Sequence, residues 1–158
     1  MIAVDWFRIS GHANVKATHR STLEFTKDNF LTPRGNCILG ISSEKAVSDL
    51  SQSVKNLIQS GSNVYAVVVV EGTYDIIKAV GSRLLTLSDK NKMIVRKSDF
   101  ISDSTLAIRA NKSAADVNRN LVDKLRRGSK GTVYVVASDA TLKDEEVLGV
   151  VVNLNTRG

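Results

Sequence analysis

The stretch 64-VYAVVVVEGTYDIIKAVG-81 predicts the centre of the fold. Val64 to Glu71 is almost entirely apolar and shows no alternation with polar residues, which is typical of a strand that is buried on both faces. Gly72 and Thr73 then supply a turn, and Tyr74 to Gly81 has the composition of a returning strand. The stretch therefore predicts a β-hairpin, and a strand buried on both faces requires further elements on each side of it.

Strand patterns occur on both sides of this hairpin. In the segment from Thr18 to Thr26, alternation places Arg20 and Glu24 on a polar face and His19 on the core face with Leu23 and Phe25. With the hairpin, the predicted strands number about nine, the last two joined by an acidic loop at 139–146. The others are Ile2 to Ile9, Asn36 to Ile41, Met93 to Lys97, Thr105 to Ala110, Thr132 to Ser138 and Val147 to Leu154.

Helices are fewer and have recognisable starts. Ser43 begins a short turn through Asp49, and Asp49 with Gln52 resembles a capping box for a helix over 50–59. A further helix is predicted from Ser113 to Arg127, where Leu121 and Leu125 belong to an apolar stripe at helical spacing. Neither an internal repeat nor a linker is apparent. We expect a single β-rich α+β domain over residues 1–158, a mostly antiparallel β-sandwich with two or three helices.

Composition excludes several classes of protein. The longest apolar run, Val64 to Val70, is far shorter than the roughly 18 to 20 residues that span a bilayer. Asp5 falls where a signal peptide needs its apolar stretch. A single Cys37 permits no internal disulfide, which agrees with a reducing compartment. We therefore expect a cytoplasmic protein without membrane contact, whose oligomeric state the sequence leaves open.

Positive charge is concentrated in one stretch. Residues 83–130 contain twelve basic and five acidic residues, a net charge of +7 in a chain of +6. This segregation favours RNA or DNA as partner, whereas the alternative is an ordinary solvated surface. Phe100 is the one aromatic residue of the stretch, so contacts to the phosphate backbone are expected rather than base stacking. The candidate residues are Arg96, Lys97, Arg109, Lys112, Lys124, Arg126 and Arg127.

A second cluster holds both histidines of the chain. It favours a pocket for a small anionic ligand, in which arginines hold the anion and a histidine exchanges protons. Zinc or iron is disfavoured because His19 and Glu24, five positions apart, point to opposite faces of a regular strand. The alternative is that His19 is a hydrogen-bonded core residue. The candidate ligand-binding residues are His12, Asn14, His19, Arg20, Glu24 and Arg34.

Catalytic motifs are not recognisable in the sequence. It has no nucleophile motif, no paired catalytic carboxylates and no phosphate-binding glycine loop, because Gly128 to Gly131 follows a helix and precedes a strand. Whether the protein is an enzyme is left open by these observations. We expect no cofactor and no bound metal.

Three blocks of sequence resemble an archaeal family of uncharacterised proteins, a domain of unknown function. They are Gly11 to His19 (GHANVKATH), Leu31 to Gly40 (LTPRGNCILG) and Val95 to Phe100 with Thr105 and Leu106, and the resemblance extends over nearly the whole chain. The resemblance implies a single-domain β-sandwich of jelly-roll character in an archaeal cytoplasm. It does not imply any particular biochemical activity. At Gly81-Ser82 the chain departs from a second Gly-His-Pro of the family, and Ser82 provides no imidazole for a metal.

Overall fold

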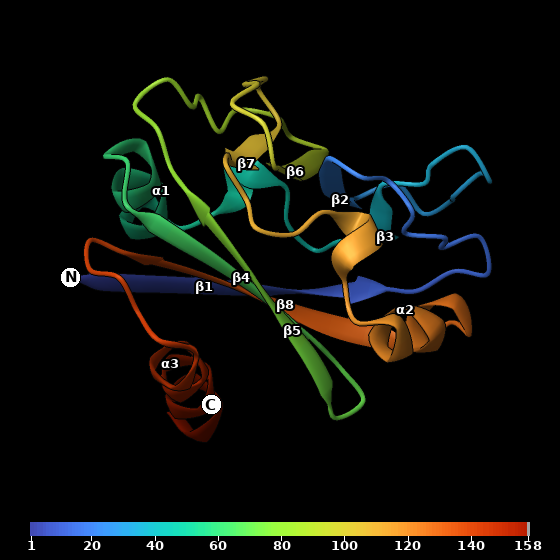
Figure 1. Cartoon of the computed structure of the whole chain (residues 1–158). Helices are drawn as coiled ribbons and strands as arrows, with labels where there is room; N and C mark the ends of the chain where they lie inside the picture. Colours follow the sequence, from blue (N-terminus) through green and yellow to red (C-terminus); the bar gives the residue numbers. More distant parts are fainter. Residues whose placement is uncertain (158) are drawn as a thin grey trace.

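Eight strands form two four-stranded sheets in the computed structural model, which describes residues 1–157 (Figure 1). The first sheet is antiparallel throughout and has the order β1 (Ile2–Ser10), β8 (Lys130–Ser138), β4 (Asn63–Val70), β5 (Thr73–Val80). The second sheet has the order β3 (Ile38–Gly40), β2 (Thr22–Thr26), β6 (Lys92–Arg96), β7 (Thr105–Ala107). Its central pair is antiparallel and its two outer pairs are parallel.

The predicted hairpin is confirmed as β4 and β5. Its turn consists of Glu71 and Gly72, with φ of +46° and +76°. Two consecutive positive φ values match the turn whose twist suits a two-residue hairpin. β4 is covered on both faces, because Ala66 and Val68 belong to the main core while Tyr65 and Val67 belong to a second apolar cluster.

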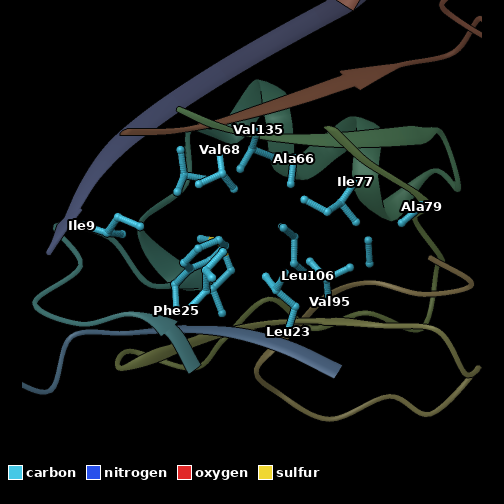
Figure 2. Close-up of a cluster of buried hydrophobic side chains, with 14 of the residues drawn as sticks. Ile9, Leu23, Phe25, Ala66, Val68, Ile77, Ala79, Val95, Leu106 and Val135 are labelled. Atoms are coloured by element: carbon cyan, nitrogen blue, oxygen red, sulfur yellow. The ribbon is translucent and has the colours of Figure 1, made fainter. Parts of the chain in front are cut away.

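The main core lies between the two sheets (Figure 2). Ala66, Val68 and Val135 of the first sheet face Leu23 and Phe25 of the second (Figure 2). Fully buried aromatic rings of Phe7 and Phe25 meet edge to face, with centroids 5.8 Å apart. The β-rich α+β class is therefore confirmed. A jelly roll is not confirmed, because two of the six strand pairings are parallel.

Two helices begin later than the sequence predicts. Ser113 and Asp116 cap a separate 3-10 turn at Ala114–Asp116, and Val117 is extended. Helix α2 (Arg119–Arg126) then starts at Asn118, whose side chain accepts hydrogen bonds from two backbone N–H groups of the first turn. In the same way Asp49 caps the 3-10 turn Val47–Asp49, and α1 spans Gln52–Gln59. The predicted stripe is confirmed, since Leu121 and Leu125 are fully buried.

The prediction of a strand from Val147 to Leu154 is wrong, because this segment belongs to helix α3 (Asp144–Arg157). The valines suggested a strand, but Val147 and Val151 recur at helical spacing and pack on the first sheet. Three acidic residues in the first turn also favour a helix start. The strand count is consequently eight, and α3 covers the face of the first sheet turned away from the second sheet (Figure 1).

The chain contains an internal duplication, so the expectation of no repeat is wrong. Strands β1 to β4 with α1 and strands β5 to β8 with α2 follow the same order, and exchanging the two halves maps each sheet order onto itself. Residue n of the first half matches residue n+70 of the second half up to the end of β2, and residue n+67 from β3 onward. The same local contacts recur, for example Ser10 N–H to Ile41 O and Val80 N–H to Ile108 O. The two halves are therefore related by an approximate two-fold axis.

The halves interlock. In the first sheet every strand neighbours a strand of the other half, because the order alternates between β1 and β4 of one half and β8 and β5 of the other. Gly11 and Gly81 extend this interlocking to the helices. The Gly11 N–H donates to Ser129 O after α2, and the Gly81 N–H donates to Ser62 O after α1.

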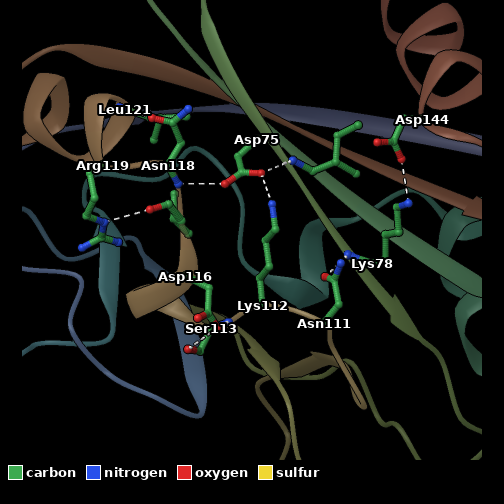
Figure 3. A network of polar contacts seen from close by, with 12 residues as sticks. Asp75, Lys78, Asn111, Lys112, Ser113, Asp116, Asn118, Arg119, Leu121 and Asp144 are labelled. Atoms are coloured by element: carbon green, nitrogen blue, oxygen red, sulfur yellow. Dashed lines mark hydrogen bonds and ion pairs between the residues drawn. The ribbon is translucent and has the colours of Figure 1, made fainter.

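Each half contains one buried aspartate that joins its strand to its helix. Asp75 on β5 accepts hydrogen bonds from the Lys112 ammonium and from the Asn118 N–H at the start of α2 (Figure 3). Asp5 on β1 binds Lys45 and the Ser51 N–H before α1 in the same way. Within residues 1–157, every fully buried polar side-chain atom has a hydrogen-bond partner.

We predict that Gly81→Ala destabilises the protein by about 1–3 kcal/mol, the usual cost of overpacking. A Cβ atom at this position would lie 1.9 Å from the backbone oxygen of Ile58, and backbone yields less readily than a flexible side chain. Urea denaturation measures the change. Gly149→Ala is the matched control, because its Cβ meets no atom within 4 Å inside α3 and should stabilise the protein slightly. Equal stability of Gly81→Ala and wild type would contradict the close approach.

Candidate functional site

The loop between β1 and β2 lies against α2. The Arg119 guanidinium donates to Ala17 O at 3.0 Å, and Arg126 Nε donates to Val15 O at 2.9 Å. Further along the loop, the His19 carbonyl accepts a hydrogen bond from Ala115 N–H. The first loop of one half and the helix of the other half therefore share one surface (Figure 1).

The loop between β2 and β3 joins this surface. Asn14 Nδ2 donates to Leu31 O at 2.7 Å, and the Asn36 carbonyl accepts hydrogen bonds from Thr18 N–H and His19 N–H. The N–H of Asn36 in turn donates to the carbonyl of Arg34. These bonds place Arg34 next to the first loop, as the anionic-ligand hypothesis requires.

Four cations of this surface are turned to solvent. Arg119 and Arg126 use their donors on loop and helix carbonyls and on Asp123, so they mainly hold the loop in place. The four cations turned to solvent are other residues, which are exposed and form no ion pair within residues 1–157. We call these four residues the basic rim: Lys16, Arg20, Arg34 and Arg127.

The equivalent surface of the other half has the same backbone but a different charge. Gln59 Nε2 donates to Leu85 O, which reproduces the bond from Arg126 to Val15 with a neutral side chain. At the positions of Lys16 and Arg127 stand Thr86 and Ser60, whereas Arg20 is matched by Lys90, and Arg83 is a further exposed cation of that loop. Arg34 has no counterpart, because the second loop spans 27–37 in the first half and only 97–104 in the second. Four exposed cations thus surround one of two similar surfaces, and two, Arg83 and Lys90, lie in the equivalent loop of the other.

Both histidines hold turns of the first loop. His12 Nδ1 accepts the Asn14 N–H at 3.0 Å, as Ser82 Oγ accepts the Leu84 N–H in the other half. His19 Nδ1 accepts the N–H groups of Ser21 and Thr22 at 3.2 and 3.1 Å. The residue equivalent to His19 is Asp89, whose carboxylate accepts the corresponding two N–H groups.

The predicted position of His19 in a strand, facing the core, is therefore wrong. β2 begins only at Thr22, and both His19 and Arg20 lie in the preceding loop, where strand alternation does not apply. The imidazole is half-buried rather than part of the core. Because serine and aspartate perform the same tasks in the other half, backbone hydrogen bonding accounts for both imidazole Nδ1 atoms.

Glu24 differs from the other candidate ligand-binding residues because its side chain is buried. Its carboxylate lies 3.8 Å from Cys37 Sγ and is only 6% exposed. Burial raises the pKa of Glu24, and burial together with the Glu24 charge raises the pKa of Cys37. A thiol of raised pKa is a poor nucleophile, so this pair is not an activated cysteine site. In the other half, Ile94 occupies the position of Glu24 and Ser104 that of Cys37.

Metal ligands do not gather in the part of the chain that the structure describes: no three His, Cys, Asp or Glu residues are placed to hold an ion. The expectation that the purified protein carries no metal stays a prediction for elemental analysis.

Most of the predicted nucleic-acid-binding residues are engaged within the protein. Lys97 pairs with Asp116 at 2.7 Å and Arg109 with Asp99 at 2.8 Å, and Lys112 binds the buried Asp75. The Lys97 contact helps to lower the pKa of Asp116 to about 2.

Three further members of this set also have partners in the chain. Lys124 donates to Thr73 Oγ1, and Arg126 pairs with Asp123. Arg96 donates to the hydroxyls of Ser102 and Thr105 and lies over the Phe100 ring. Arg127 remains as the member of the set without such a partner within residues 1–157, and it directly follows α2. Sequence reasoning missed Lys16, which lies within the GHANVKATH block but outside the basic stretch.

Comparison with known proteins shows which part of the chain matches a protein family. A family model described as "Domain of unknown function (DUF371)" matches residues 7–138. An uncharacterised protein of Methanocaldococcus jannaschii, MJ0206, is 42% identical over 123 residues, which cover 78% of this chain and 91% of that protein. The family match begins within β1 and ends where β8 ends, so it covers nearly all of both halves of the duplication and excludes α3. Among the described residues no helix is long and apolar enough to cross a membrane.

We predict that Glu24→Gln stabilises the protein more at about pH 7.5 than at about pH 4. The raised pKa means that the folded state binds the proton more tightly than the unfolded state, so stability falls as pH rises through the folded pKa. Glutamine has no charge to bury, so the variant avoids this loss of folding stability at the higher pH. Urea denaturation of variant and wild type at both pH values measures it.

Glu44→Gln is the control of opposite sign. The hydrogen bonds from Arg8 lower the pKa of Glu44, so its ionised form stabilises the folded state above the unfolded pKa. This variant should lose more stability at about pH 7.5 than at about pH 4. A pH-independent effect of Glu24→Gln would show that the carboxyl is not desolvated.

Proposed function

Because this chain belongs to the DUF371 family, a domain of unknown function, we propose its function from its own residues: it binds nucleic acid through the phosphate backbone, using the basic rim. Ammonium and guanidinium groups bind phosphate oxygens, and guanidinium does so in a planar, two-point geometry. The rim thus replaces the long basic stretch of the sequence as the proposed contact surface.

The difference between the two halves is the observation that supports this proposal. Two surfaces with the same backbone hydrogen bonds differ in charge, and folding alone requires no such difference. The surface shared by the loops of the first half and α2 carries four exposed cations without an ion pair inside residues 1–157, against two, Arg83 and Lys90, in the equivalent loop. Concentrated unpaired cations attract polyanions and raise the association rate.

A binding role agrees better with the local chemistry than a catalytic role. The Cys37 thiol has a raised pKa, and both histidines accept backbone hydrogen bonds through Nδ1. A small anion is the competing ligand, and inorganic phosphate serves as its probe in the test below.

Fluorescence anisotropy with labelled oligonucleotides tests the proposal. Four phosphate contacts predict a slope of log Kobs against log salt concentration of about −3 for a single strand. Inorganic phosphate at millimolar concentration should compete no better than an equal ionic strength of chloride. Absence of binding at low salt would refute the proposal, and specific competition by phosphate would favour the small-ligand alternative.

We predict that Lys16→Glu combined with Arg20→Glu weakens oligonucleotide binding by more than about tenfold at low salt. The matched control is Arg83→Glu with Lys90→Glu in the equivalent loop, which changes the formal net charge from +6 to the same +2. The control should lose less than about threefold. Equal losses would mean that net charge alone, and not the rim, governs the binding.

A further inference from the structure

The middle of the outer face of the first sheet consists of three rows of side chains, fixed by the strand register. In each row the residues come from β1, β8, β4 and β5 in turn. The rows are Val4, Val136, Tyr65, Lys78; then Trp6, Tyr134, Val67, Ile76; then Arg8, Thr132, Val69, Tyr74.

Helix α3 covers only part of this face. Lys78 pairs with Asp144 at 2.6 Å (Figure 3), and the Leu142 N–H donates to the Tyr65 hydroxyl at 2.8 Å. The first row is therefore tied to α3 and the segment before it. The third row and the outer end of the second row remain open. Trp6 is 44% exposed and Tyr74 is 48% exposed.

The open row is the two-fold equivalent of the covered row, but its chemistry differs. Arg8 stands where Lys78 does, yet it binds Glu44 within its own half instead of a residue of α3. Thr132 replaces the large Tyr65 by a small hydroxyl. This row mixes aromatic, polar and cationic groups, so it does not reproduce the apolar surface that holds α3.

The open row leads directly to the basic rim. Along β1, Trp6 is followed on the same face by Arg8 and Ser10, a distance of about 13 Å. Ser10 pairs with Lys130, the first residue of β8. Lys130 is exposed and follows Arg127 of the rim by three positions. A short strand of nucleic acid whose phosphates contact the basic rim can therefore place a base against the exposed indole of Trp6.

We infer that the open part of this sheet face, centred on Trp6, stacks unpaired bases, so that the nucleic acid bound is single-stranded. This inference rests on the proposed function and specifies its ligand. Bases stack on aromatic side chains without sequence preference, and a sheet face bearing exposed aromatic rings is suited to splayed bases. Bases of a duplex are stacked within the helix and do not reach the indole.

The single tryptophan of the chain makes the test direct, because all tryptophan fluorescence reports on Trp6. Titration of the full chain with a mixed-sequence single strand should quench this fluorescence, with the same midpoint as anisotropy. A duplex of equal length should bind more weakly and leave the fluorescence unchanged.

Substitutions separate stacking from folding. Trp6→Ser should weaken single-strand binding roughly five- to a hundredfold, the range measured for loss of one stacked base. Trp6→Phe retains a ring and should lose less than about threefold. Leu84→Ser removes a side chain that is 75% exposed, in the loop before β6, and should change nothing.

The outcomes distinguish this inference from the proposed function. Binding by anisotropy without quenching, or unaffected by Trp6→Ser, overturns the stacking platform and leaves the backbone contacts of the rim. No binding by anisotropy refutes both. A dimer in sedimentation that depends on Trp6 and persists with nucleic acid bound would make this face an interface between copies, and it also overturns the inference.

Discussion

Two buried carboxylates fix the relation between strand and helix on which the rest of the structure depends. The side chains of Asp5 and Asp75 are each about one-tenth exposed, and each binds a lysine ammonium and a backbone N–H before a helix. A buried charge is costly unless it is paired and fully hydrogen-bonded, so only one placement of the helix satisfies it. Asp75 thus positions α2, α2 positions the first loop through Arg119 and Arg126, and the loop carries the basic rim.

Local sequence patterns predicted the elements whose own residues decide their structure. The hairpin follows from a continuous apolar run and a glycine, and Leu121 and Leu125 face the core because their spacing is helical. The same reasoning failed where packing decides. The valines of α3 have high strand propensity, and contacts with the first sheet together with an acidic first turn make the segment helical. The Ser113–Asp116 box is real, but it closes a short turn.

The candidate site was predictable only in part. The two loops that carry His12, Asn14, Arg20 and Arg34 do adjoin. His12 and His19 attracted attention by their residue type, although serine and aspartate perform the same hydrogen bonding in the other half. Lys16 and Trp6 lie outside the basic stretch, and only the pairing of β1 with β8 brings Lys130 next to Ser10, on the sheet face that also carries Trp6. The duplication was missed because the halves preserve spacing more than residue identity, as at His19 and Asp89.

The interlocked strands have a consequence for how the two surfaces can evolve. A half chain alone would expose both edges of its strands β1 and β4, so it would be expected to associate with a second copy about the same axis. In such a homodimer any substitution appears twice, and both loop surfaces must carry the same charge. Joining the halves in one polypeptide removes that restriction. The two loop surfaces can then carry different numbers of exposed cations, and a three-residue loop extension can arise on one side only.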